Sequence, residues 1–221
     1  MTLSRVDPSP RPVENYDVGR PWPVTVAAVR WDELFADIEG QLEHELDLEQ
    51  QGLAAEEERL RLGRLVLRDR VLAMARGGER VSLVLADGET VAVRVESAGR
   101  DWVAGEIPAG SAGRAVVVPL ASIAGVLPGH EQLELGLRPL PAEAVPALAA
   151  RLGLGFVMRD LCRRRTGVEL RTRGGIVHGT IDRVARDHLD VAEHDAGAAR
   201  RDRVVRRIRL VPFDAILCVR A

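Results

Sequence analysis

Apolar and polar residues alternate through two stretches of the chain, and this period of two predicts half-buried β-strands. The first stretch begins at Val81 and the second at Val168. Each contains a turn signal, Asp87-Gly88 in the first and Gly174-Gly175 in the second, of a kind that favours tight hairpins. We therefore expect each stretch to open with a β-hairpin.

The two stretches also resemble each other position by position. Residues 91–103 match residues 177–189, and the dipeptide Arg-Asp falls at the same place in both. Residues 118–126 match residues 211–219, and each segment contains a proline, which lacks the N–H that a strand ladder needs. The pattern indicates an internal duplication, with about five short strands in each copy.

Helical spacing of apolar residues precedes both copies. Before the first copy a helix is expected from Leu53 to Arg76, with Leu60, Leu67, Val71 and Met74 on one face, and before the second copy a helix is expected from Ala142 to Arg165. Nearer the start of the chain, the clearest helical pattern predicts a helix from Trp31 to Gln51. Gly52 is expected to end this helix. One face of this helix forms a candidate partner-binding surface, which consists of Trp31, Leu34, Phe35, Ile38 and Leu42.

Four positions of the second copy, Gly175, Gly179, Ile181 and Asp187, resemble the first sequence motif of the Sm/LSm-like family. The first copy keeps Gly88 and Asp101 but has valine in place of Gly179. Neither copy has the asparagine or the Arg-Gly pair of the RNA-binding members, so their uridine pocket is not implied. The layout also resembles uncharacterised actinobacterial proteins labelled Fis-family transcriptional regulators, although no helix-turn-helix pattern is present.

The resemblance implies a mostly β fold with α-helical N-terminal segments, built as two small Sm-like five-stranded barrels that are each preceded by a helix. The expected organisation is a disordered proline-rich tail at 1–29, an acidic amphipathic helix at 30–58, the first barrel with its helix at 59–127, a linker at 128–142, and the second barrel with its helix at 143–221.

Charge is unevenly distributed along a chain whose formal net charge is only −2. Residues 32–58 contain eleven acidic residues and no arginine, whereas residues 151–221 contain sixteen arginines and nine acidic residues. A basic surface of this kind is typical of contact with a phosphate backbone. The candidate nucleic-acid-binding residues are Arg163, Arg164, Arg165, Arg200, Arg201, Arg203, Arg206, Arg207 and Arg209.

These patterns leave two functions open. The first is a non-enzymatic regulatory protein that binds RNA or DNA through the second barrel, and the second is a protein-interaction scaffold that uses the acidic helix and the barrel edges, by self-association or with another protein. No catalytic, cofactor-binding or small-molecule motif is found. The two cysteines and five histidines match no metal-binding spacing, and no apolar run reaches the ~20 residues that span a bilayer. We expect a cytoplasmic protein without a cofactor.

Overall fold

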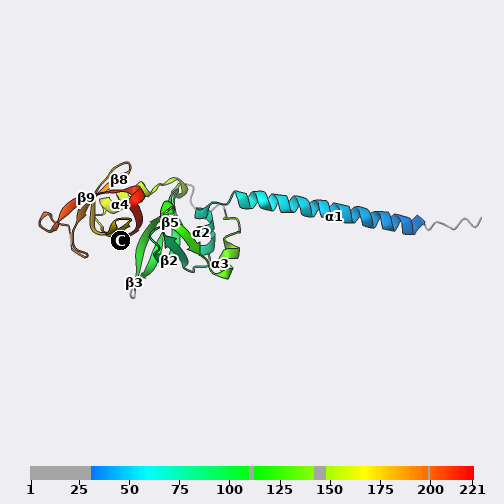
Figure 1. The fold of residues 1–221 in the computed structure, drawn as a ribbon, viewed down its shortest axis with the longest axis horizontal. Helices are drawn as coiled ribbons and strands as arrows, with labels where there is room; N and C mark the ends of the chain where they lie inside the picture. Colours follow the sequence, from blue (N-terminus) through cyan, green and yellow to red (C-terminus); the bar gives the residue numbers. More distant parts are fainter. Residues whose placement is uncertain (1–30, 110–111, 142–147, 199) are drawn as a thin grey trace, which may run out of the picture. The chain divides into compact units, whose positions relative to one another are not determined.

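The computed structural model describes residues 31–109, 112–141, 148–198 and 200–221 (Figure 1). It divides into two units, residues 1–57 and 58–221, which are described separately. The tail expected at 1–29 lies outside the described residues. The described part of the first unit is the helix α1 (Trp31–Gly63), which ends inside the second unit.

Helix α1 passes through Gly52 without interruption, so the break expected there is wrong. A glycine inside a helix costs about 1 kcal/mol relative to alanine, which its helix-forming neighbours Leu53, Ala54 and Ala55 can offset. The chain leaves the helix only after Gly63, and Val66 is already extended. The stretch that was expected to be one helix over 53–76 is therefore divided between the end of α1 and the separate helix α2 (Leu67–Ala75).

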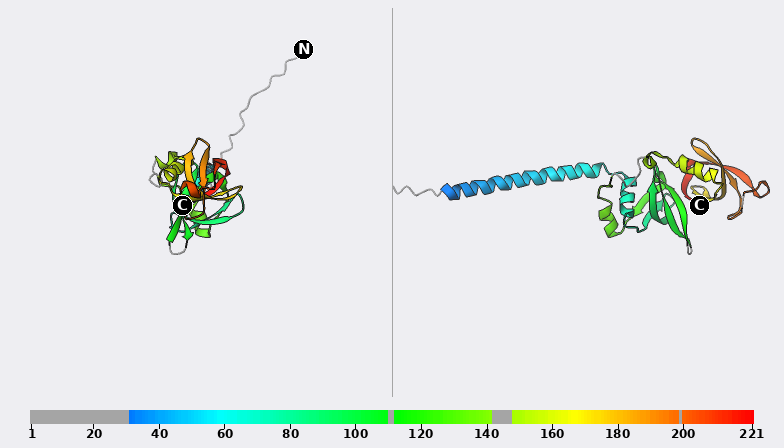
Figure 2. Two further views of the ribbon diagram at one scale, coloured as in Figure 1. Left: turned by 90° about the vertical axis from the view of Figure 1, so that its left-hand side faces the viewer. Right: turned by 180° about the vertical axis from the view of Figure 1, so that it is seen from behind.

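Three short helices pack within the second unit. Helix α2 buries Val71 and Met74, and α3 (His130–Leu135) lies beside it in the segment expected to be a linker (Figures 1 and 2). The amide of Gln132 fixes α3 by donating to the backbone oxygen of Arg80 at 3.0 Å. Helix α4 (Leu154–Arg163) begins later than the expected start at Ala142, after a single 3₁₀ turn at Ala149–Arg151; residues 142–147 lie outside the described part.

Ten strands form one antiparallel sheet in the described residues, in the order β5-β1-β2-β3-β4-β10-β6-β7-β8-β9. Each copy contributes five consecutive positions, and the strands of the two copies follow the same order. The strands are β1 (Val81–Leu85), β2 (Thr90–Ala98), β3 (Trp102–Ala109), β4 (Ala112–Pro119), β5 (Ile123–Leu127), β6 (Gly167–Thr172), β7 (Gly175–Val184), β8 (His188–Glu193), β9 (Arg207–Pro212) and β10 (Ile216–Arg220).

The mostly β class is confirmed, but the expectation of two separate five-stranded barrels is wrong. Strand β4 of the first copy pairs with β10 of the second, with Val117 opposite Val219 and Val116 opposite Arg220. This pairing joins the copies into one open sheet whose outer strands are β5 and β9. Alternation within a strand shows which face is buried, but it does not show which strand lies alongside, so the sequence could not reveal this connection.

The two joined strands are buried on both faces. Val116, Val117 and Val118 of β4 are consecutive and all buried, as are Ile216 to Val219 of β10. Their side chains belong to two hydrophobic clusters. The cluster of the first copy contains Val116, Val118, Leu217 and Cys218, and the cluster of the second copy contains Val117, Ile216 and Val219. Each copy therefore completes the core of the other.

Polar contacts strengthen the same junction. The hydroxyl of Ser122 lies 2.7 Å from the backbone oxygens of both Pro119 and Leu217, one in each copy. Glu169 of β6 accepts from Arg114 of β4 at 3.1 Å and from Arg220 of β10 at 2.8 Å. Burial opposes ionisation of Glu169, but the two guanidinium groups outweigh it and hold the pKa of this carboxyl below its usual value.

Gly179 lies where two strands approach closely. A Cβ atom at this position would overlap the backbone oxygen of Ala192 on the neighbouring strand β8. The sequence predicts a bend or bulge at Gly179, and the irregularity in the pairing of β7 with β8 lies slightly further on, between Ile181 and Arg183. The absent side chain at Gly179 permits the close approach itself.

We predict that Gly179→Ala lowers the free energy of unfolding by about 1–3 kcal/mol, because the added methyl group forces β7 and β8 apart. Gly125→Ala in β5 is the matched control, since nothing lies within 4 Å of the added methyl group there. The urea midpoint, compared at an unchanged dependence on urea concentration, measures both effects. Equal midpoints for the two variants would contradict the close approach.

Candidate nucleic-acid interface

Most of the arginines predicted to contact nucleic acid are paired with carboxylates of the same copy. Arg163 and Arg164 contact Asp160 at 2.6 and 2.7 Å, and Arg206 contacts Asp195 at 2.5 Å. Arg207 contacts Glu193 at 2.6 Å, and Arg209 contacts the other oxygen of the same carboxylate. Arg201 and Arg203 are exposed and have no ion pair within the described part of the chain.

Asp182 brings two distant parts of the predicted set together. It binds Arg165 at 2.9 Å and both Nε and Nη2 of Arg200, at 2.7 and 2.8 Å. The hydrogen bonds from Arg200 are the main reason that the pKa of Asp182 is lowered. A cavity of about 320 Å³ adjoins Arg165 and Arg200, but their charges are already shared with Asp182. Arg165 and Arg200 are thus brought together, but they share one carboxylate that offsets part of their positive charge.

A second group of arginines lies at the junction of the two copies. The loop between β2 and β3 holds Arg100 and Asp101, and this loop meets the start of α4. Asp101 Oδ1 accepts the N–H of Leu154 at 2.7 Å, while the backbone oxygen of Leu152 accepts the N–H of Arg100 at 2.9 Å. The indole N–H of Trp102 donates to the same oxygen of Leu152 at 3.1 Å. These bonds fix the first copy against the helix of the second.

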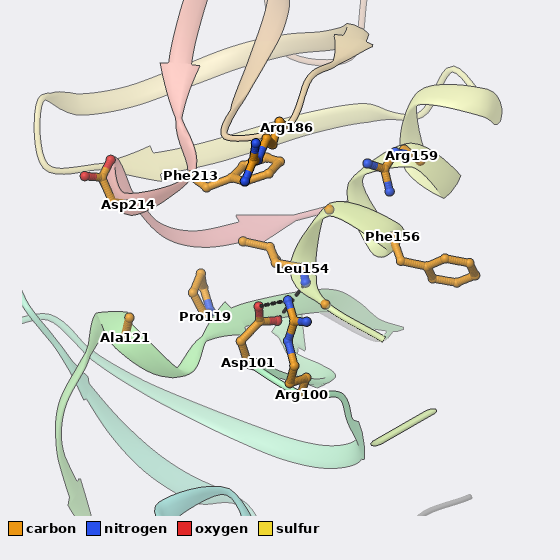
Figure 3. A pocket seen from close by; sticks show the side chains of 12 residues that line it. Arg100, Asp101, Pro119, Ala121, Leu154, Phe156, Arg159, Arg186, Phe213 and Asp214 are labelled. Carbon is orange, nitrogen blue, oxygen red and sulfur yellow. Dashed lines mark hydrogen bonds and ion pairs between the residues drawn. The ribbon is translucent and has the colours of Figure 1, made fainter. Parts of the chain in front are cut away.

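An open cavity of about 370 Å³ lies against this contact (Figure 3). Arg100, Arg159 and Arg186 reach it from three separate elements: the β2–β3 loop, α4, and the loop between β7 and β8. Phe213 contributes an apolar wall, and Phe156 lies at the rim, more than half exposed. In Figure 3 the carboxylate of Asp214 points away from the three arginines.

The arginines of this cavity differ from the predicted set in their pairing. Arg159 and Arg186 form no ion pair with a described carboxylate, and Arg100 has only a 3.4 Å contact with Asp101. Asp101 meanwhile directs its other oxygen to the first N–H of α4. Three guanidinium groups beside an aromatic ring can bind phosphate oxygens and a base, which are two of the three parts of a nucleotide.

Sequence reasoning missed Arg100, Arg159 and Arg186 as site residues. The signal for two of them was present, because Arg100-Asp101 and Arg186-Asp187 are the dipeptides that match between the copies. The aspartate of the first dipeptide has a structural role, since Asp101 accepts the N–H of Leu154. Arg159 carries no comparable signal, since one arginine in an amphipathic helix normally faces solvent.

The described residues contain no group of three or more His, Cys, Asp or Glu side chains placed to hold a metal ion. Both cysteines are free, and burial raises the pKa of the Cys218 thiol to about 11. A thiol with so high a pKa is protonated at neutral pH and is a poor nucleophile.

The candidate partner-binding surface lies on α1. Phe35, Ile38 and Leu42 are each at least half exposed, and Leu46 and Leu53 continue the same face along the helix. The side chains of Trp31 and Leu34 lie outside the described part of the structure. The part of α1 in the first unit thus presents an apolar stripe at its surface.

A scan against protein-family models gave no match, and a search of the curated proteins gave none. Within the described ranges, no helix has both the length and the apolar character needed to cross a membrane.

We predict that Asp101→Ala lowers the free energy of unfolding by about 0.5–2 kcal/mol, because α4 loses the carboxylate that caps its first N–H. Asp101→Asn should retain most of the stability, since the amide oxygen can accept the same bond. Asp214→Ala removes a carboxylate at the same cavity and should have almost no effect, since no hydrogen bond or ion pair joins that side chain to another residue in the described ranges. Thermal or urea unfolding of the three variants checks this order, and equal losses in all three would contradict it.

Proposed function

We propose that this protein binds single-stranded nucleic acid at the cavity between its two copies, and that it acts as a non-enzymatic regulatory protein through that binding. One observation carries the proposal: Arg100, Arg159 and Arg186 converge on one cavity, and among the described residues the ion pair of these three is limited to a 3.4 Å contact between Arg100 and Asp101. The proposed site thus consists of other arginines than those predicted from the sequence, most of which form ion pairs. Two free cysteines fit the reducing cytoplasm in which we place this role.

The shape of the site favours single strands over duplexes. The cavity is a local hollow beside Phe213, with the exposed ring of Phe156 at its edge. An unpaired base can enter such a hollow and contact a ring, whereas the bases of a duplex are already stacked. The arginines around it suit the phosphates on either side of that base.

We predict that the double variant Arg159→Gln/Arg186→Gln binds a labelled mixed-sequence 12-nucleotide RNA at least about tenfold more weakly at 50 mM salt, since two phosphate contacts are lost. The slope of log affinity against log salt should fall by about 1.4, that is, about 0.7 for each contact with a single strand. Fluorescence anisotropy between 50 and 200 mM salt measures both quantities, with the DNA of the same sequence and its duplex alongside.

The matched control is Arg206→Gln/Arg207→Gln, which removes the same charge from arginines paired with Asp195 and Glu193. It should change affinity by less than about twofold. The absence of binding by the unaltered protein at 50 mM salt, or equal losses in the two double variants, would refute the cavity as the site. A Phe156→Ala variant further tests base contact, which is worth about 1–3 kcal/mol for each stacked base.

The stripe on α1 supports a second function, docking of a basic protein segment. Ile38, Leu42, Leu46 and Leu53 are between 47% and 68% exposed on a helix that has eleven acidic residues and no arginine over 32–58. Two such helices side by side would repel each other at neutral pH. We therefore propose that the occupant is an amphipathic helix with an apolar face and flanking lysines or arginines.

We predict that a designed peptide with a leucine stripe and lysine flanks binds the full chain, and that binding weakens as salt rises. A peptide of the same stripe with glutamate flanks should not bind. Ile38→Ser/Leu42→Ser should weaken binding at least about tenfold, because apolar burial is lost. Leu48→Ser, on the opposite face of α1, is the control, and calorimetry is the measurement. Equal binding of the two peptides would contradict a basic partner.

A further inference from the structure

The outer strands of the sheet are copies of the strands that pair at its centre. In the match between the two copies, residues 118–126 correspond to 211–219, so β5 is the equivalent of β10 and β9 is the equivalent of β4. Strands β4 and β10 pair within the chain, whereas β5 and β9 are the two outer strands. We propose that β9 of one chain pairs with β5 of a second copy of this chain, in the register that β4 and β10 adopt at the centre.

The side chains of the outer strands support this pairing. Leu210 of β9 is 64% exposed, while its equivalent in β4, Val117, is 9% exposed. Ile208 of β9 and Leu127 of β5 are likewise exposed, at 48% and 59%. Outer strands that must remain unpaired usually carry charges or prolines against association. Strand β9 also carries Arg207, Arg209 and Pro212, but its Leu210 is an exposed apolar residue at the position that Val117 occupies, buried, at the central junction.

The loops beside β9 correspond to one side of the contact that joins the two copies at the centre of the sheet, namely the side formed by the first copy. A cavity of about 600 Å³ is lined by Arg186, Asp187, His188 and Leu210, which are the equivalents of Arg100, Asp101, Trp102 and Val117. In the first copy this surface is covered by α4 and the residues before it, through the bonds of Leu152 and Leu154. In the second copy the same surface is open.

Helix α2 corresponds to the other side of that contact, which α4 forms at the centre of the sheet. It is the equivalent of α4, since the buried Val71 and Met158 hold the same place in the two helices, four residues after Leu67 and Leu154. Leu154 is 6% exposed and capped by Asp101, whereas Leu67 is 42% exposed and the start of α2 has no side-chain cap. The side chain of Asp187 is 83% exposed. The pairing would bring Asp187 of one chain to the start of α2 in the next.

The proposed contact uses different surfaces on the two chains, so the assembly as a whole keeps one unpaired β5 and one unpaired β9 until it closes. Such head-to-tail contacts produce closed rings or open filaments. Pairing of β5 with β5, or of β9 with β9, would instead stop at two chains. The proposal does not depend on nucleic-acid binding, since the pairing of β9 with β5 requires no ligand, although Arg186 and Phe213 line both the cavity beside β9 and the cavity at the central junction.

The first test is the mass of the full chain by light scattering across a concentration series, without nucleic acid. We expect a mass that rises to a multiple of the 24.1 kDa chain, and more than twofold at the highest concentration. Leu210→Glu should return it to a single chain, because a charge would be buried in the contact. Ile176→Glu is the control, as Ile176 is also exposed but lies at the start of β7. A single-chain mass throughout, or an assembly that Leu210→Glu leaves intact, would overturn the proposal.

The second test fixes the register. Arg220 lies opposite Val116 at the centre, so Leu127 should lie opposite Arg209 of the neighbouring chain. Residues directly opposite in antiparallel strands are close enough for a disulfide. Under mild oxidation, a mixture of Leu127→Cys chains and Arg209→Cys chains should form cross-linked pairs of twice the chain mass, and neither variant should do so alone. Cross-linking of Leu127→Cys alone, or no cross-linking in the mixture, would refute the head-to-tail pairing.

Discussion

The pairing of β4 with β10 is the constraint on which the rest of this structure depends. It places two strands at the centre of one sheet, where both faces of each are covered by apolar side chains. Leu217 and Cys218 enter the core of the first copy, and Val117 enters the core of the second. Neither copy is therefore independent, because separating them would expose part of both cores to water.

The candidate site follows from that junction. Asp101 of the first copy caps α4 of the second, and the cavity that results collects arginines from both copies. The arginines that the sequence concentrates in the second copy are arranged differently, since Asp160, Asp182 and Glu193 each bind two of them. The number of arginines in a segment thus says little about the electrostatic potential at its surface. The positions of the carboxylates decide where positive charge remains available.

The internal duplication also explains why the two ends of the sheet differ from its centre. Strands of the same two kinds occur twice in the chain, once paired at the centre of the sheet and once at its two outer edges. Inside, Val117 and Val219 are buried; outside, Leu210 remains exposed beside an open cavity. A head-to-tail assembly would remove this difference by giving each outer strand the neighbour that its equivalent already has. Nucleic-acid binding at the central cavity and assembly at the edges would then use neighbouring surfaces that share Arg186 and Phe213.

The sequence by itself determined the duplication, the alternating strands, the hairpin turns and the acidic helix, because each depends on residues near one another in the chain. It indicated a mostly β protein but not how the copies join, since the partner of β4 lies about a hundred residues away and any apolar strand edge could have served. It located the basic residues of the second copy but not their carboxylate partners. Only the tertiary structure decided which arginines have carboxylate partners, because Asp182 and Arg200 are brought together by the sheet and its loops and not by their spacing.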